Sequence, residues 1–163
     1  MKNNFKDILK GKVVIVGIGN ILRGDDAFGP VFIEKIKEHI DAICIDAGNA
    51  PENYVGKIAK LKPDTILIVD AVHLDLKPGE YEILGKNDIN KSGFTTHTLS
   101  PVMFIEYLEK EIDANIYILG IQPKNTSFGE EISGNVAETL KELSELIIES
   151  ISGKQEYAGQ KNN

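Results

Sequence analysis

Residues 13–30 read VVIVGIGNILRGDDAFGP. The first four are apolar and mostly β-branched, which is typical of a strand covered on both faces, and we predict this strand from Lys12 to Ile18. Glycines at positions 17, 19 and 24 permit backbone conformations that other residues resist, and Pro30 suits the first turn of a helix. The stretch therefore predicts a strand, a loop and a helix, with two adjacent acids, Asp25 and Asp26, in the loop.

The rest of the chain continues this alternation of extended and helical segments. We predict further strands at Ala42–Asp46, Asp64–Val72, Tyr81–Leu84 and Asn115–Ile121, with Asp64–Val72, the most apolar, in the centre of the sheet. Helices are predicted at Pro30–Ile40, Pro51–Leu61, Pro101 to about Ile112 (capped by Ser100) and from Val136 to Ile151. The alternation predicts a single-domain, three-layer α/β/α sandwich with a mainly parallel, twisted sheet.

Two polar stretches, Gly85–Thr96 and Gln122–Gly134, are predicted to be irregular loops beside the crevice at the strand ends, where they could grip a substrate or be ordinary connections. The folded domain is predicted to span residues 1–152. We expect residues 153–163 to form a disordered tail.

Composition narrows the classes of function. The 163 residues are 42% hydrophobic and 26% charged, with a formal net charge of −7 and no clustered basic face, which argues against a nucleic-acid surface. The sequence shows neither a membrane-spanning run nor the apolar segment of a signal peptide, so we expect no membrane association. Cys44 is the single cysteine, which fits a cytoplasmic protein, and we expect it to be a small buried hydrophobe instead of a nucleophile.

Polar side chains at successive strand ends are the first candidates for a site, because loops at the carboxyl ends of parallel strands share one crevice. Asp25 and Asp26 follow the first strand, Asp70 ends the central strand, and His97 precedes a helix. Two carboxylates and an imidazole can hold a divalent transition metal. Taken singly, Asp70 could instead cap a turn and His97 could be a hydrogen-bonded loop residue. The adjacent acids predict either free solvation or a nearby cation.

An alternative begins from Gly17-x-Gly19 after a strand, with Asp46 at the end of the next strand, as in a dinucleotide-binding oxidoreductase. The match is poor, because Leu22 replaces the third glycine of that motif. Asp25 and Asp26 would also place negative charge beside a pyrophosphate. We therefore disfavour this alternative.

Five motifs occur in order along the chain: Gly19–Asp26 with Gly29-Pro30, Ala50–Asn53, Ile68–Ala71, Thr95–His97 and Leu119–Pro123. With these motifs the chain resembles the nickel-iron hydrogenase maturation endopeptidases, in particular the hydrogenase-3-type and archaeal branch. The resemblance implies a three-layer α/β protease that removes a short C-terminal extension from the precursor of a hydrogenase large subunit after nickel insertion. It matches the family's metal-contacting carboxylates to Asp26 and Asp70 and its histidine to His97, so that the metal is the nickel carried by the precursor.

Two mechanisms are compatible with that resemblance. The substrate's nickel could dock on Asp26, Asp70 and His97 and orient the scissile peptide near an activated water. Alternatively, Asp26 and Asp70 could share a proton as the acid pair of an aspartyl endopeptidase. A different class of function is a non-catalytic, nickel-dependent chaperone of the precursor. We expect a monomer in each case.

The chain departs from the family pattern at Ala27, where many members have glycine. Alanine tolerates positive φ poorly, so we predict either a slightly different loop or a negative φ at this residue. The loop containing Phe128 is also less family-like. Among the other histidines, His39 is expected to be solvated on a charged helix, and His73 is a weaker site candidate just beyond Asp70.

Overall fold

The computed structural model describes residues 4–89 and 101–151. It contains a five-stranded sheet made of β1 (Val13–Ile18), β2 (Ile43–Gly48), β3 (Thr65–Ala71), β4 (Tyr81–Gly85) and β5 (Asn115–Ile121). The strand order is β2-β1-β3-β5-β4, and only β4, at one edge, pairs antiparallel. The middle position of β3 confirms that the most apolar strand is central.

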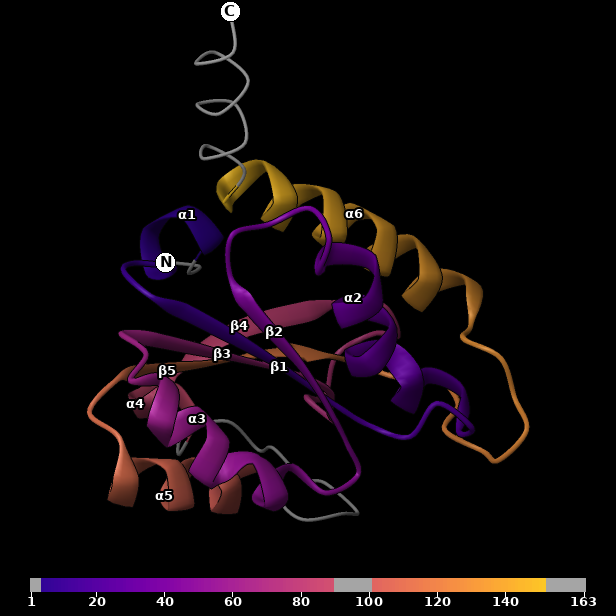
Figure 1. Cartoon of the computed structure of the whole chain (residues 1–163). Helices are drawn as coiled ribbons and strands as arrows, with labels where there is room; N and C mark the ends of the chain where they lie inside the picture. The colour runs from indigo at the N-terminus through magenta and orange to yellow at the C-terminus, as the bar shows by residue number, and fades with distance from the viewer. Residues whose placement is uncertain (1–3, 90–100, 152–163) are drawn as a thin grey trace, which may run out of the picture.

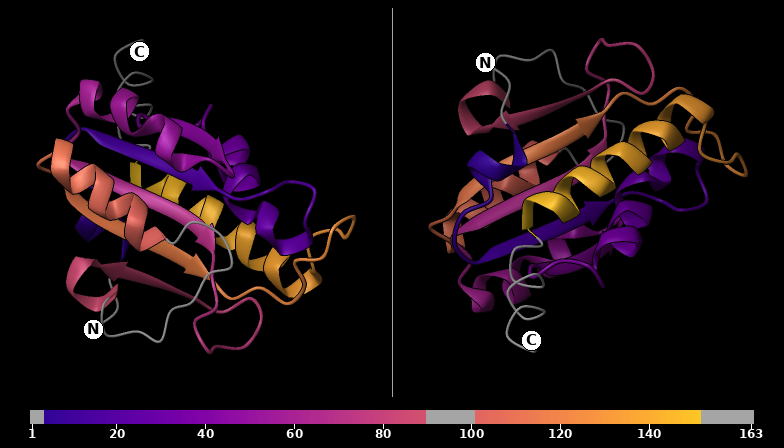
Figure 2. Two further views of the ribbon diagram at one scale, coloured as in Figure 1. Left: turned by 90° about the horizontal axis from the view of Figure 1, so that it is seen from below. Right: turned by 90° about the horizontal axis from the view of Figure 1, so that it is seen from above.

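Helices cover both faces of the sheet. Figure 1 shows α1 (Phe5–Ile8), α2 (Phe28–Ile36) and α6 (Gly134–Ile151) on one face, with α3 (Val55–Leu61) and α5 (Pro101–Glu111) on the other, and the two views of Figure 2 agree. The short helix α4 (Lys86–Ile89) follows the edge strand β4. The three-layer α/β/α arrangement predicted from the sequence is therefore confirmed.

Each central strand contributes side chains to two hydrophobic cores, because successive side chains of a strand point to opposite faces. In β1, Val13 and Ile15 join the core under α1, α2 and α6, whereas Val14 and Val16 join the core under α3 and α5. All six residues of β1 are buried. This double burial explains why the strand is continuously apolar, without the alternation of a half-exposed strand.

Several predicted boundaries differ from the structure. The helix predicted from Pro30 to Ile40 is α2, which begins at Phe28 and ends at Ile36. A 3-10 helix, η1 (Gly24–Ala27), leads directly into it, so the first turn starts earlier, and Pro30 lies in that turn, where a missing N–H breaks no hydrogen bond. The helix predicted from Pro51 likewise begins with a 3-10 turn, η2 (Pro51–Tyr54), before α3.

One prediction was wrong in part, one helix was not predicted, and other predictions lie beyond the described residues. The loop predicted from Gly85 to Thr96 was wrong at its start, where α4 forms, and no element was predicted at the N-terminal helix α1. Helix α1 is only one turn long, and its sequence signal is a cap in which Asn4 accepts from the N–H of Asp7. The cap at Ser100 and the tail at 153–163 fall outside the residues that the structure describes.

The topology places the loops after β1, β3 and β5 at one end of the sheet, because these strands run parallel. In Figure 1 this is the right-hand end, where the segment after β1 and the loop after β5 lie beside each other. In the described parts of the chain, no helix is long and apolar enough to cross a membrane.

Candidate functional site

Asp25 is a completely buried carboxylate that ties two loops together, with 0% of its surface exposed. The backbone N–H groups of Lys124, Asn125 and Ser133 donate to its two oxygens at 2.8, 3.0 and 2.7 Å. The Ser133 hydroxyl donates to the same carboxylate, at 2.9 Å from Oδ2 and 3.0 Å from Oδ1. Asp25 thus anchors both ends of the loop after β5 to η1.

The environment of Asp25 corrects the expectation that both adjacent acids are either solvated or beside a cation. Asp25 is neither, since backbone N–H groups and one hydroxyl replace its hydration. The sequence carried only a weak signal for this contact. Ser133, one residue before α6, has the pattern of a helix cap, yet both its N–H and its hydroxyl donate to Asp25.

Asp26 lies on the same 3-10 turn but remains half-exposed. The backbone N–H of Asn20 donates to its Oδ2 at 2.8 Å, which holds the carboxylate over the turn that follows β1. Burial raises the pKa of Asp26, while the bond from Asn20 and the nearby Arg23 charge act in the opposite direction. The carboxylate is therefore oriented by the backbone and still accessible from solvent.

Glycines bring this turn close to the sheet. At Gly19, with φ of 144°, a Cβ would collide with the backbone oxygen of Asp26. At Gly29, a Cβ would lie 2.6 Å from the carbonyl oxygen of Val69 in β3. Only glycine permits these approaches, and together they place η1 against the end of β3.

Asp70 lies near the carboxyl end of β3, with 4% of its surface exposed. Burial raises its pKa well above the ordinary 3.8, the negative charge of Asp26 raises it further, and a hydrogen bond from the N–H of Ala71 lowers it. The turn η1, which carries Asp26, packs against β3, which carries Asp70, so the structure places the two predicted acids on contacting elements. Two carboxylates in one partly buried site favour either a shared proton or a cation.

The third predicted ligand, His97, lies outside the described residues. Within residues 4–89 and 101–151, no three side chains of His, Cys, Asp or Glu converge on a point that could hold a metal ion. The metal site predicted from Asp26, Asp70 and His97 therefore stays a prediction.

We expect the stability of the free protein to fall as the pH rises through the acid range. Because the folded-state pKa of Asp70 is raised, the folded chain keeps a proton that the unfolded chain loses near pH 3.8. This stabilising contribution is complete below that pH and is lost as the pH rises through the raised value. Thermal unfolding followed by circular dichroism should show a steeper decline for the wild type than for Asp70→Asn, and parallel pH profiles would contradict the expectation.

The loop after β1 does not have the open backbone of a phosphate-binding loop. Its Gly17 and Gly19 face the backbone of the following helical turns, at Gly29 and Asp26, instead of an open cradle. Asp46, the acid of the dinucleotide alternative, is exposed and accepts the N–H of Gly48 in a turn at 3.0 Å. Ala27 has φ of −73°, so the family's glycine is replaced without strain, as one of our two predictions stated.

The remaining predicted candidates have structural explanations. The Gln122 side chain accepts the N–H of Leu74 at 2.7 Å and lies 3.3 Å from Nδ1 of His73, so it orders the segment after β3, a role that the sequence did not reveal. His39 is exposed, as expected. Cys44 is half-buried in β2, less than predicted, and burial raises the pKa of its thiol to about 11, which opposes a nucleophilic role.

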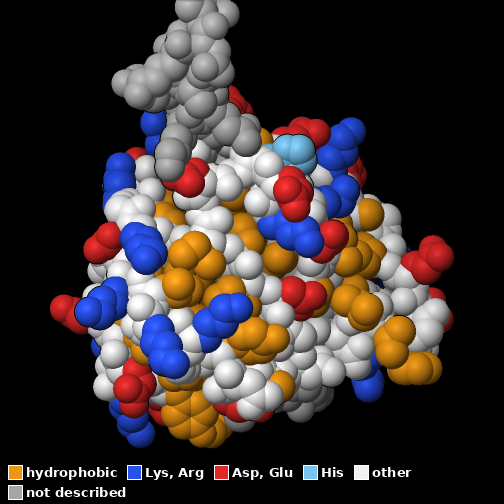
Figure 3. Space-filling view, viewed as in Figure 1, with side chains coloured by type: hydrophobic (Ala, Val, Ile, Leu, Met, Phe, Trp, Pro, Cys, Tyr) orange, Lys and Arg blue, Asp and Glu red, His pale blue; other side chains and the backbone are white. Residues whose placement is uncertain are grey.

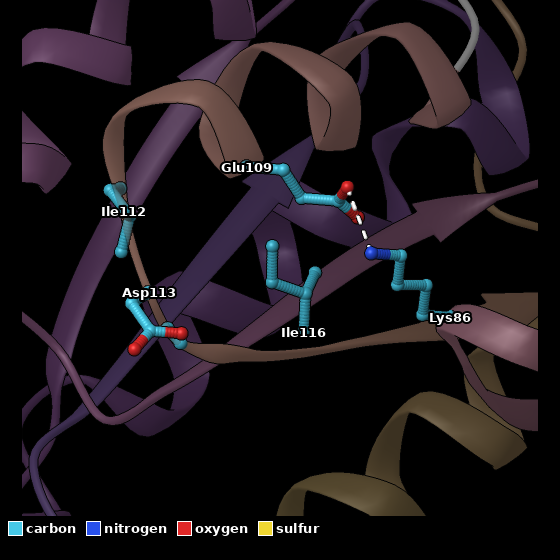
Figure 4. Close-up of a pocket in the computed structure, with 6 residues that line it drawn as sticks. Lys86, Glu109, Ile112, Asp113 and Ile116 are labelled. Carbon is cyan, nitrogen blue, oxygen red and sulfur yellow. Dashed lines mark ion pairs between the residues drawn. The ribbon is translucent and has the colours of Figure 1, made fainter.

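Two surface hollows lie away from the acid pair. One, of about 200 Å³, is lined by Ile112, Asp113 and Ile116 and crossed by an ion pair at 3.0 Å between Lys86 and Glu109 (Figure 4). It lies at the amino end of β5, opposite to the end that carries Asp70. The other, of about 330 Å³, lies between residues of α6 and the chain around Lys35 and His39. Neither contains the predicted site residues.

The chain is similar to known proteins along most of its length. The family model for hydrogenase maturation proteases matches residues 31–150. The hydrogenase 3 maturation protease of Escherichia coli is 33% identical over 149 residues, covering 90% of this chain and 92% of that protein. The crystal structure of a nickel-iron hydrogenase maturation protease from Thermococcus kodakarensis matches with a TM-score of 0.81 and 37% identity, over 90% of this chain and 97% of that one.

A solution structure of an endopeptidase from Escherichia coli matches as well, with a TM-score of 0.75 and 32% identity, over 88% of this chain and 94% of that one. These similarities extend along nearly the whole chain and agree with the motifs and the three-layer fold. They favour a peptidase over the dinucleotide-binding oxidoreductase. The chain belongs to the hydrogenase maturation protease family, and it is a peptidase of that family.

Proposed function

We propose that this peptidase removes a C-terminal extension from the nickel-loaded precursor of a nickel-iron hydrogenase large subunit and that it recognises the inserted nickel. The observation that carries the proposal is the placement of Asp26 and Asp70, which come from separate motifs, at one end of the sheet with interacting charges. A divalent cation on the substrate would relieve their mutual repulsion. Binding would then depend on a precursor that already contains its metal.

In this proposal the nickel is part of the substrate. Carboxylate and imidazole groups are suitable ligands for it, and His97 would complete the set with Asp26 and Asp70. The chain's own contribution is orientation, because Asn20 fixes Asp26 and the end of β3 fixes Asp70. Docking through the metal would hold the nearby scissile peptide in place, so that an encounter in solution becomes an oriented attack by water.

A second mechanism within the same activity uses the two acids as a proton-sharing pair. The raised pKa of Asp70 supports it, since one carboxyl group of such a pair must hold a proton while the other activates water. The two mechanisms differ in what they require of the precursor. Nickel recognition requires a metal-loaded precursor, whereas an acid pair alone would cut a metal-free tail equally well.

The test is to incubate the purified protein with nickel-loaded and nickel-free large-subunit precursor from the same organism and to measure the product mass. We expect a shortened large subunit from the nickel-loaded precursor only. Equal cleavage of both would refute nickel recognition and leave the peptidase activity intact. Stable binding without any shortening would favour the non-catalytic chaperone.

We also propose that the protein acts in the cytoplasm as a monomer. A single, half-buried cysteine is compatible with a reducing compartment and supports the location. Sedimentation of the purified protein at several concentrations would reveal any association, and fractionation of the source cells would test the location.

A further inference from the structure

Three large apolar side chains are exposed at the end of the sheet that carries the acid pair. Phe128 is 72% exposed, Ile21 is 64% exposed and Leu22 is 55% exposed. We call these three residues the apolar rim. Figure 3 shows hydrophobic side chains gathered at the right-hand end of the molecule, over the loops that follow β1 and β5. The position of Phe128 is unusual, since it lies in a tight turn, where polar residues are favoured.

The rim is assembled from two distant parts of the chain that are hydrogen-bonded to each other. The backbone N–H of Gly129 donates to the carbonyl of Leu22 at 2.8 Å, directly beside Phe128. The N–H of Gly24 donates to the carbonyl of Glu130 at 3.1 Å, which adds a second link. These bonds keep the apolar residues of the two loops in one patch.

The buried carboxylate of Asp25 joins the same two loops through hydrogen bonds. Its carboxylate holds Lys124, Asn125 and Ser133 through their backbone N–H groups, so the loop that presents Phe128 is anchored on both sides. A rigid surface of this kind loses little conformational entropy on binding, which favours affinity. The arrangement is therefore preorganised for a contact.

The rim is also close in the chain to the acid pair. Leu22 lies four positions before Asp26, and both residues contact Asn20: the N–H of Leu22 donates to Asn20 Oδ1, and Asp26 Oδ2 accepts the N–H of Asn20. Asn20 therefore links the rim directly to Asp26.

We propose that the apolar rim docks a hydrophobic segment of the substrate polypeptide. This inference rests on the proposed function, because it takes the occupant to be the hydrogenase precursor. A protease of this family acts on a protein, and the rim is continuous with the residues proposed to contact the cleaved region. A polypeptide substrate is therefore favoured over a second copy of this chain, and burial of these side chains would supply binding free energy that is independent of the nickel.

The experiment measures cleavage of the nickel-loaded precursor at several precursor concentrations. We expect Phe128→Ser to raise KM about 10-fold and the double variant Leu22→Ser, Phe128→Ser to raise it about 100-fold, with kcat changed less than about 2-fold. The matched control is Leu146→Ser, which removes an apolar side chain that is 45% exposed on α6, far along the helix from the site, and should leave KM unchanged. Thermal unfolding should be equal in all four proteins.

Three results would overturn the proposal. They are an unchanged KM in the double variant, a fall in kcat at constant KM, and a larger sedimenting mass for the wild type than for the rim variants, which would assign the surface to a second copy. If the wild type binds the precursor without cutting it, the proposed function fails. The apolar rim is then tested by the dissociation constant for the precursor, measured by fluorescence anisotropy, which should rise in the same rim variants.

Discussion

Asp70→Asn is expected to abolish processing of the precursor while the fold is kept. The side chain keeps its shape but loses its charge and its ability to exchange a proton, and both proposed mechanisms require one of these properties. Loss of a positioned acid or base lowers rates by about 100-fold to 10,000-fold, so we expect a loss of at least about 100-fold in the rate of large-subunit shortening. Gel electrophoresis of the precursor over time measures it.

The stability of this variant separates a chemical role from a structural one. Asp70 is buried, with a raised pKa, so its charge is unfavourable in the folded protein at neutral pH. We therefore expect Asp70→Asn to unfold at a temperature equal to or above that of the wild type, as is common when a residue is retained for function at the expense of stability. Normal processing by the variant would refute the assignment of Asp70 to the site.

Asp25→Ala should be the most destabilising change at this end of the molecule. It would leave three partly buried backbone N–H groups and the Ser133 hydroxyl without their acceptor. An unsatisfied buried donor costs about 1–3 kcal/mol, so the free energy of unfolding should fall by about 3 kcal/mol or more. Urea unfolding, monitored by circular dichroism, measures the difference.

Ser133→Ala is the matched control, because it removes only the hydroxyl contacts and keeps the N–H bond from Ser133. We expect a loss of about 1 kcal/mol and retained cleavage. Equal stability of Asp25→Ala and the wild type would show that Asp25 does not anchor the loop. If Asp25→Ala does not fold, the graded loss in the Ser133 variant still tests the anchor.

The parts of the fold that could be predicted from the sequence depend on local patterns. Continuous apolar runs such as Val13–Ile18 identify buried strands, and the spacing of residues such as Val136 and Leu140 identifies α6. Helix ends were predicted less well, since the start of α2 depends on the 3-10 turn before it. The short α4 lies in a polar stretch without an apolar stripe, so periodicity could not reveal it.

The candidate site could be predicted only as far as the ends of the strands could be predicted. Asp26 and Asp70 were chosen because parallel strands bring their carboxyl ends together, and in the structure the turn that carries Asp26 contacts the strand that carries Asp70. The different environments of Asp25 and Asp26 could not be predicted, because adjacent positions of a 3-10 turn face different partners and one partner is a loop more than one hundred positions later. His97 remains a prediction.

The anchoring of the loop after β5 has a consequence for how this enzyme could be altered. At positions 124 and 125 the contacts to Asp25 involve only backbone N–H groups, so they place little demand on the side chains there, whereas Ser133 also contributes its hydroxyl. Positions 126–132 lie between these anchored residues. This interval is therefore an exchangeable module, in which the sequence of the tip can be replaced by that of a relative to redirect substrate choice while the two acids keep their places.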